Sequence, residues 1–256
     1  MYRQIAESLR EQIESGKLRP GQQLPTELEL REEHGASRNT VRDAIKWLMN
    51  LDLVETRPGQ GTFVVQKIAP YITMLSGEPG AGEGAAYPFQ VRKHGRTPSS
   101  TEPQVEIQKA TSGVATELGL PEGTQVISRH EKRYIDGTPW SLQTSFYPRG
   151  FALQGAERLL FADNIEGGAV HYLNETLGLR QVGYRDWITV RPPNGSEAEF
   201  FKLSADGRVA VFENFRTAFD QTGSPMRVTV TVFPTDRNQF IVEIGDVSEP
   251  QVQRGT

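Results

Sequence analysis

The sequence predicts an α+β protein of two domains: a small unit of three helices and a β-hairpin, then a larger domain built on an antiparallel sheet. Helical periodicity with capping residues dominates the first 50 residues, whereas strand-like alternation around glycine turns dominates the second half and repeats after 86 residues. A chain of 256 residues also exceeds the common size of one domain. We expect boundaries at residues 1–66, 67–87, 88–247 and 248–256.

The composition is that of a folded globular chain, with 36% hydrophobic and 23% charged residues. No run of about 18 apolar residues occurs, and the N-terminus is amphipathic rather than signal-like, so we expect a cytoplasmic chain without a membrane partner. The absence of cysteine excludes disulfides, thiol nucleophiles and cysteine metal sites. A net charge of −4 argues against general attraction to nucleic acid, so any such binding needs a local basic surface.

The first two helices are defined by apolar spacing and by their end signals. Apolar residues at a four-residue spacing predict a helix over residues 3–15, and the glycines and prolines of residues 16–25 end it. Thr26 and Glu29 have the spacing of a capping box, in which the Thr hydroxyl and the Glu carboxylate each accept from the other's backbone N–H. A second helix is therefore expected over residues 27–34.

A tight turn and a third helix follow. Gly35 lies in the turn, and Ser37 is placed to cap a helix over residues 38–50. Two helices joined by a three-residue turn with glycine make a helix-turn-helix. Short strands over residues 53–57 and 62–65 are joined by a glycine-rich turn. The resulting hairpin completes a winged helix-turn-helix.

The start of the third helix carries arginine, asparagine and threonine, the residue types that meet base edges and phosphates in recognition helices. Residues 1–66 hold nine Lys/Arg and ten Asp/Glu, but the acids gather on the first two helices and the bases on the third helix and hairpin. The alternative is a stable small fold whose arginines are only solvated. We favour a DNA-binding surface, with expected contacts at Thr26, Ser37, Arg38, Asn39, Thr40, Arg42, Arg57, Gly59, Gln60 and Gly61.

Residues 16–30, 35–48 and 53–64 resemble the winged helix-turn-helix of the GntR family of bacterial regulators. Two positions depart from the family pattern: Leu28 stands where an arginine is usual, and Asp52 where a glycine is frequent. The resemblance implies major-groove and phosphate contacts by Arg38, Thr40 and Arg42, and entry of residues 59–61 into the minor groove.

The second half begins after a glycine-rich stretch within residues 67–87, which we expect to be a flexible linker. Beyond it, Pro139 and Pro148 recur as Pro225 and Pro234, both 86 residues later. Each copy has a short helix, a glycine turn and two alternating strands. Two such units predict one antiparallel sheet with helices packed on it and a cleft between the halves.

Residues 88–246 resemble the UTRA effector domain of the HutC subfamily of GntR regulators, which shares its fold with chorismate lyases. The resemblance rests on the motif at residues 118–123 and on the Arg-x-x-Asp-Gly-x-Pro hairpin at residues 133–139. It implies that this domain, besides dimerising, binds a small-molecule effector in the cleft.

The expected effector contacts depart from those of family members that sense phosphorylated sugars. Such members carry two arginines at the positions of Glu131 and Arg133, and a glutamate in place of Gln143. Phosphate binding without paired cationic donors is disfavoured, so we expect an effector other than a sugar phosphate. The alternative is ion pairing on a solvated strand face and, for His171, the capping of a core helix. The expected contacts are Phe89, Glu131, Arg133, Gln143, His171 and Arg227.

These patterns predict a transcription regulator, most simply a repressor, that binds a near-palindromic operator as a homodimer and is released by its effector. A constitutive DNA-binding dimer without an effector is the first alternative. An enzyme of lyase-like fold is the second, but the sequence has no Ser-His-Asp spacing, paired-carboxylate motif or metal-ligand cluster. No cofactor and no metal are expected.

Overall fold

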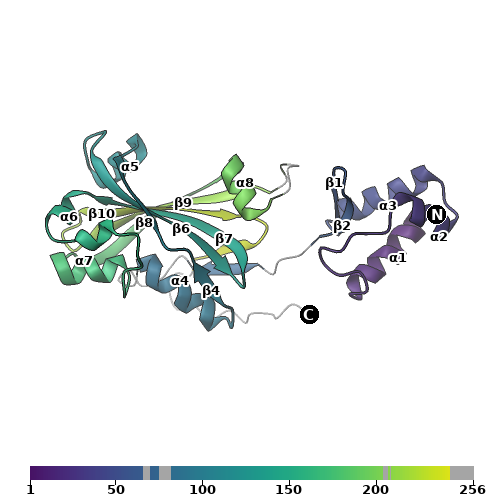
Figure 1. Cartoon of the computed structure of the whole chain (residues 1–256), viewed down its shortest axis with the longest axis horizontal. Coiled ribbons are helices and arrows are strands. Elements are labelled where there is room, and N and C mark those ends of the chain that lie inside the picture. The colour runs from purple at the N-terminus through teal and green to yellow at the C-terminus, as the bar shows by residue number, and fades with distance from the viewer. Residues whose placement is uncertain (66–69, 75–81, 204–206, 208, 243–256) are drawn as a thin grey trace. The chain divides into compact units, whose positions relative to one another are not determined.

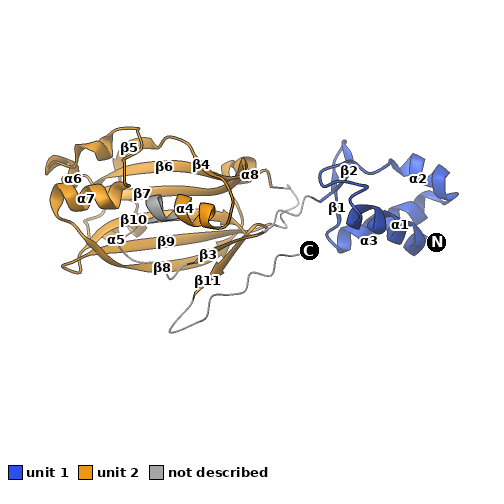
Figure 2. Ribbon diagram, turned by 90° about the horizontal axis from the view of Figure 1, so that it is seen from below, with its two compact units in different colours: residues 1–69 blue, residues 70–256 orange. Residues whose placement is uncertain are grey.

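The computed structural model describes residues 1–65, 70–74, 82–203, 207 and 209–242 (Figure 1). The chain divides into two compact units, Met1–Ala69 and Pro70–Thr256, which Figure 2 colours separately. The expectations for residue 66 and for a C-terminal tail at 248–256 lie outside the described residues. No helix among the described residues is long and apolar enough to cross a membrane.

The first unit has the three helices and the hairpin that the sequence predicts. Its elements are α1 (Tyr2–Glu14), α2 (Glu27–His34), α3 (Arg38–Asn50), β1 (Val54–Arg57) and β2 (Gly61–Val64). Each helix contributes a leucine to one core, Leu9, Leu30 and Leu48, and all three are fully buried. The strands β1 and β2 pair antiparallel. The apolar stripes therefore bury one face of each helix and leave the polar faces exposed.

Capping residues set the helix boundaries of the first unit. The Thr26 hydroxyl accepts from the Glu29 N–H at 3.3 Å and the Glu29 carboxylate accepts from the Thr26 N–H at 2.7 Å, which confirms the predicted capping box. The hydrogen bonds that this carboxylate accepts from the Thr26 N–H and from the Thr26 hydroxyl lower the pKa of Glu29. Ser37 caps α3 by accepting from the Thr40 N–H at 3.2 Å. After α3, Asp52 has a φ of +52°, so an aspartate adopts the left-handed conformation that glycine favours.

The second unit is built on a seven-stranded sheet. The strand order is β4-β6-β7-β10-β9-β8, with β5 pairing with β6, and these neighbouring strands pair antiparallel. A separate two-stranded sheet joins β3 and β11 in parallel. The elements are β3 (Tyr71–Met74), α4 (Gly82–Lys93), β4 (Pro98–Ser100), β5 (Gln104–Lys109), α5 (Ser112–Leu118), β6 (Gln125–Ile135), β7 (Thr138–Pro148), α6 (Gly150–Leu153), the 3-10 helix η2 (Glu157–Leu160), α7 (Ala169–Leu177), β8 (Gln181–Arg191), α8 (Gly195–Phe201), β9 (Val211–Asp220), β10 (Pro225–Pro234) and β11 (Asn238–Ile241).

The internal repeat is a local twofold arrangement of the two long hairpins. Strands β7 and β10 are neighbours, and Thr144 pairs with Val230, which is its own counterpart 86 residues later. The hairpins β6–β7 and β9–β10 are therefore related by an axis that passes between these two residues. Each half also carries a strand before its short helix: β5 pairs with β6, and β8 pairs with β9. These two leading strands are an addition to the predicted repeat, which began with the helix.

The two faces of the sheet carry different helices (Figure 1). Val114 and Leu118 of α5 pack on Val126 and Val228, and α8 covers the same side. Helices α6 and α7 and the 3-10 helix η2 cover the opposite face through a cluster that includes Leu159. Because side chains alternate along a strand, the odd-numbered residues of β6 and β7 lie on this second face. It holds the pocket described below.

The described part of the expected linker, residues 70–74 and 82–87, contains regular structure, whereas residues 67–69 and 75–81 lie outside the described residues. Within them, Tyr71–Met74 forms β3, and α4 begins at Gly82. Tyr71 is only 5% exposed, and its ring meets the edge of the Trp140 ring at a centroid distance of 6.3 Å. The partner strand of β3 is β11, about 165 residues later in the chain. A pairing over that separation leaves no local sequence signal. The expectation of a linker therefore rested on the glycine content alone.

Candidate functional site

The start of α3 presents two exposed arginines that share one carboxylate. The side chains of Arg38 and Arg42 are 70% and 63% exposed. Their Nε atoms lie 3.2 Å and 3.9 Å from the carboxylate oxygens of Glu27 on α2. Asn39 is exposed beside them, and the Thr40 hydroxyl lies 2.8 Å from that of Ser37. The helix start therefore offers guanidinium, amide and hydroxyl groups on one accessible surface.

The hairpin between β1 and β2 is held in shape by side chains on both strands. The Arg57 guanidinium donates to Glu55 Oε1 at 2.7 Å and lies 4.3 Å from the centroid of the Phe63 ring. Gly59 and Gly61 have φ angles of +73° and +117°, which few residues other than glycine adopt. Because glycine has no side chain, the backbone at the tip can approach a duplex closely.

A contact from outside the hairpin was not anticipated from the sequence. Gln23 Nε2 donates to the Gln60 carbonyl at 2.9 Å, and a Cβ atom at Gly61 would lie 2.4 Å from the same nitrogen. Gln23 precedes α2, and no sequence motif marked it as a contact of the hairpin. Thr26, expected to contact DNA, has its hydroxyl engaged with Glu29 in the capping box.

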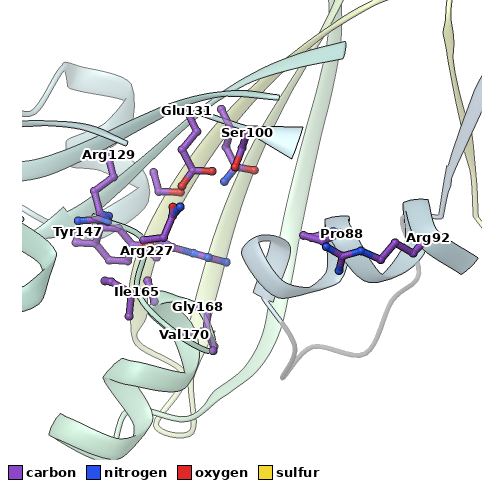
Figure 3. A pocket seen from close by; sticks show the side chains of 15 residues that line it. Pro88, Arg92, Ser100, Arg129, Glu131, Tyr147, Ile165, Gly168, Val170 and Arg227 are labelled. Carbon is purple, nitrogen blue, oxygen red and sulfur yellow. The ribbon is translucent and has the colours of Figure 1, made fainter. Parts of the chain in front are cut away.

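A cavity of about 410 Å³ lies on the second face of the large sheet. Strand residues, including Glu131 and Arg227, form one side of it, and Pro88 and Arg92 of α4 face it from across the space (Figure 3). The loop before α7 and the start of that helix form a further wall. The lining residues are Pro88, Arg92, Ser100, Arg129, Glu131, Gln143, Ser145, Tyr147, Asn164, Ile165, Gly167, Gly168, Ala169, Val170 and Arg227.

Three of the six expected effector contacts line this cavity: Glu131, Gln143 and Arg227. The other three do not. Arg133 is 4% exposed, and its guanidinium carbon lies 4.9 Å from the centroid of the Tyr87 ring. Phe89 is 69% exposed on α4, because a four-residue helical spacing turns Pro88 and Arg92 toward the cavity and Phe89 away. His171 lies on the outer side of α7, with Nε2 3.1 Å from the Glu175 carboxylate.

Arg129 lines the cavity and was missed by the sequence argument. Its guanidinium donates to the carbonyl oxygens of Leu159, Phe161 and Asp163 at 2.9, 2.7 and 2.6 Å. Burial lowers the pKa of this guanidinium. Arg129 therefore holds the segment that leads toward α7 and has few donors left for a ligand. Its position two residues before Glu131, on the same strand face, was the available signal.

The polar side chains on the sheet side of the cavity are largely buried, and they differ in how many hydrogen-bond partners they have. Gln143 is 5% exposed, and its Oε1 atom has no hydrogen-bond donor among the described residues. Glu131 lies directly opposite Gln143 in the pairing of β6 with β7. Arg133 Nη2 donates to Glu131 Oε2 at 3.4 Å. Arg227 is 3% exposed and donates through Nη2 to Gln181 Oε1 at 3.1 Å.

The loop before α7 owes its shape to a pair of glycines. Gly167 and Gly168 have φ angles of +73° and +86°, and a Cβ atom at Gly167 would lie 2.7 Å from the His171 ring. Gly168 is the N-cap of α7, a helix of nine residues. The first N–H groups of a helix have no partner within it and carry the positive end of its dipole. This wall therefore favours an anionic group in the cavity.

Metal ligation has no support in the part of the chain that the structure describes. No group of three or more His, Asp or Glu side chains gathers there in a way that could hold an ion. The sequence contains no cysteine.

Comparisons with known proteins follow the same division of the chain. Residues 1–64 match the model of the bacterial regulatory proteins, gntR family, and residues 93–239 match the UTRA domain. The HTH-type transcriptional regulator RB1450 of Rhizobium meliloti (strain 1021) is 30% identical over 248 residues, which are 95% of this chain and 94% of that protein.

Two further relatives are similar over most of their length. The HTH-type transcriptional repressor NagR of Bacillus subtilis (strain 168) is 24% identical over 242 residues, 94% of this chain and 93% of that protein. The crystal structure of PhnF from Mycobacterium smegmatis has a TM-score of 0.56 at 22% identity, and covers 94% of this chain and 99% of that chain. At this identity the last comparison concerns the fold alone.

Proposed function

The chain belongs to the GntR family of bacterial regulatory proteins and carries a UTRA domain, and we propose that it represses transcription from an operator until a small molecule releases it. As a member of this family it is a DNA-binding transcriptional regulator and not an enzyme. The observation that supports release by a small molecule is the cavity of about 410 Å³ on the sheet, which falls in the size range of small-molecule sites.

The proposed DNA surface is the start of α3 together with the tip of the hairpin. Arg38, Asn39 and Arg42 are exposed on one helix start, which supports base and phosphate contacts in a major groove. The positive φ angles of Gly59 and Gly61 support an approach of the hairpin to the backbone or the minor groove. The full set of proposed contacts remains Thr26, Ser37, Arg38, Asn39, Thr40, Arg42, Arg57, Gly59, Gln60 and Gly61.

The proposed working form is a homodimer, because two recognition helices then reach successive major grooves about 34 Å apart and the operator is a near-palindrome. Strand β8 supports it: this edge strand has eleven residues, and its Trp187 and Val190 are 57% and 61% exposed. The four residues 187–190 carry no charge. An edge segment without charges is prone to pair with another strand, and an antiparallel edge fits a second copy of itself about a twofold axis.

The proposed effector is not a sugar phosphate. Glu131 brings a carboxylate into the cavity, and the guanidinium of Arg129 is already engaged by backbone carbonyls. The remaining arginines, Arg92 and Arg227, come from different walls rather than side by side. A dianionic phosphate would therefore lie near Glu131 without a paired set of cationic donors.

The test uses the full-length protein and duplexes tiled across the DNA that flanks its own gene. We expect one inverted-repeat duplex to bind with two protomers and at least about 10³-fold more tightly than a scrambled duplex of equal length. If the protein binds the inverted-repeat and scrambled duplexes equally at modest salt, the proposed operator contacts would be wrong. If no added fraction of cellular metabolites changes the affinity for the operator, the result would favour a constitutive DNA-binding dimer without an effector.

A further inference from the structure

We propose that Gln23 is a positioning residue for DNA binding, which holds the tip of the β1–β2 hairpin in the conformation that meets the duplex. Gln23 lies before α2, outside both the hairpin and α3. This inference rests on the proposed function, because it explains how the proposed contacts at Gly59, Gln60 and Gly61 are kept in place. Three features carry it: an anchored backbone, a donor at the tip, and a glycine at the point of contact.

The backbone on both sides of Gln23 is anchored to β2. The Leu24 N–H donates to the Thr62 carbonyl at 2.7 Å, and the Val64 N–H donates to the Gln22 carbonyl at 2.8 Å. The residue between them forms an isolated antiparallel bridge with the same strand. Leu24 is 3% exposed and belongs to the core of the first unit. The Gln23 side chain therefore starts from a fixed point beside the hairpin.

The Gln23 amide reaches the tip of the hairpin. Its Nε2 donates to the Gln60 carbonyl at 2.9 Å. The Gln60 N–H donates in turn to the Arg57 carbonyl at 3.0 Å and closes the turn. Residues 57–60 are exposed, and exposed turns open easily because few contacts hold them. A hydrogen bond from outside the hairpin therefore restricts a segment that its own contacts hold only weakly.

The same amide lies against the backbone of Gly61. A Cβ atom at this position would collide with Gln23 Nε2 and would lie 3.3 Å from Gln23 Cδ. A Cβ atom at Gly59, by contrast, would meet no atom within 4 Å. The amide thus supports the backbone at Gly61 and leaves the space at Gly59 open to a duplex.

Order at the tip before binding has a direct consequence for affinity. A segment that is already held in its bound conformation loses less conformational freedom in the complex. Two other roles for Gln23 make different predictions. A direct contact with DNA would leave the free hairpin unchanged when Gln23 is replaced, and a role in stability alone would lower affinity for every duplex equally.

The experiment compares three variants of the full-length protein. Gln23→Met keeps the length of the side chain and removes the donor, whereas Gln23→Lys keeps a donor. Gln22→Met is the matched control, because the Gln22 side chain accepts from the Arg19 N–H at 3.0 Å. Hydrogen exchange and thermal unfolding are measured on the free protein. Affinity and hydroxyl-radical footprints are measured on the inverted-repeat duplex and on its scrambled counterpart.

In Gln23→Met we expect the Gln60 N–H to exchange about twofold to tenfold faster, at an unchanged thermal midpoint. Operator affinity is expected to fall by about twofold to tenfold for each protomer bound, with little change for the scrambled duplex. The footprint should lose protection of the minor-groove sugars beside each half-site and keep protection over the major-groove contacts. Gln23→Lys and Gln22→Met are expected to match the wild type in exchange and in footprint.

Three results for Gln23→Met would overturn the positioning role. Exchange and footprint that both match the wild type would show that the amide does not hold the tip. Weaker operator binding with unchanged exchange in the free protein would make Gln23 a direct DNA contact. A lower thermal midpoint with equal losses on both duplexes would leave it a role in stability alone.

The wild-type footprint separates this inference from the proposed function. If the wild type does not protect the sugars beside the half-sites, the proposed hairpin contacts are wrong and the positioning role falls with them. If the wild type protects these sugars and Gln23→Met protects them equally, the hairpin contacts stand and only the role of Gln23 is wrong.

Discussion

At the residue scale, one carboxylate organises the cationic start of α3. Glu27 lies within 4 Å of both Arg38 and Arg42, yet both arginine side chains stay more than 60% exposed. Exposed ion pairs of this kind contribute about 0–1 kcal/mol to stability. A DNA phosphate or a base edge can therefore displace Glu27 at small free-energy cost, and the pair keeps the guanidinium groups oriented beforehand.

Replacing Arg38 by alanine is expected to weaken operator binding by about 1–3 kcal/mol while leaving affinity for random DNA nearly unchanged, because a bidentate base contact carries sequence discrimination. Fluorescence anisotropy on operator and scrambled duplexes at one salt concentration measures the ratio. Arg10→Ala is the control, since Arg10 pairs with Glu7 and Glu14 within α1. An unchanged ratio in Arg38→Ala would exclude that role.

The pocket shows how far single residues could be placed from the sequence. Alternation along predicted strands put Glu131 and Gln143 among the candidates, and both line the cavity. Arg129 was missed because its partners are carbonyls of residues 159–163, about 30 residues later and in irregular structure. Phe89 and His171 do not line the cavity, because the rotation of α4 and α7 against the sheet depends on tertiary packing.

At the element scale, the two edges of the large sheet differ in how they resist further pairing. The edge formed by β4 and β5 uses short strands, and β5 carries Glu106 and Lys109. The edge formed by β8 is eleven residues long, and its charged residues Arg185, Asp186 and Arg191 flank an uncharged run at residues 187–190. Charges and short strands protect an edge, so the long strand β8 is most open to a partner along its uncharged run at residues 187–190.

A double change of Trp187 and Val190 to lysine is expected to convert the proposed dimer to monomers, because like charges would then oppose each other across the twofold axis. Sedimentation velocity at micromolar concentration measures the change. Ile107→Lys is the matched control, since Ile107 is 47% exposed on β5 at the other edge. A double variant that sediments like the wild type would rule out β8 as the interface.

Elements with local signals were predictable and elements with distant partners were not. The helices of the first unit follow from capping residues such as Thr26 and Ser37, whose partners lie three residues away. The long hairpins follow from their turns and from the 86-residue repeat. Strand β3 has its partner about 165 residues later, so the glycine-rich composition around it suggested a linker.

At the scale of the whole molecule, one ion pair with a buried carboxylate contributes to the acid stability of the second unit. Arg191 donates through both Nη atoms to the Glu197 carboxylate at 2.7 Å, and the Glu197 side chain is 7% exposed. These hydrogen bonds lower the pKa of Glu197 below its value in the unfolded chain. The stabilisation is therefore complete above the unfolded pKa of about 4.3 and is lost as the pH falls through the folded pKa.

Glu197→Gln is expected to lower the free energy of unfolding at pH 7 by about 1–3 kcal/mol, because Arg191 keeps Glu213 as a second partner at 2.6 Å. Urea denaturation at pH 7 and at pH 3.5 measures the difference, which should shrink at the lower pH. Glu199→Gln, on the exposed side of α8, is the control. A difference that is equal at both pH values would contradict the assignment of the acid sensitivity to this pair.

Release of the operator by a ligand is a coupling between two sites, and coupling is reciprocal. If the ligand weakens operator binding by a given factor, the operator must weaken ligand binding by the same factor, which for typical couplings of about 1–3 kcal/mol lies between about 5 and 150. Calorimetry of the ligand with free protein and with protein saturated by operator is expected to show that factor. A ligand that binds both forms equally would have no means of shifting the equilibrium, and the protein would then be a constitutive DNA-binding dimer despite its occupied cavity.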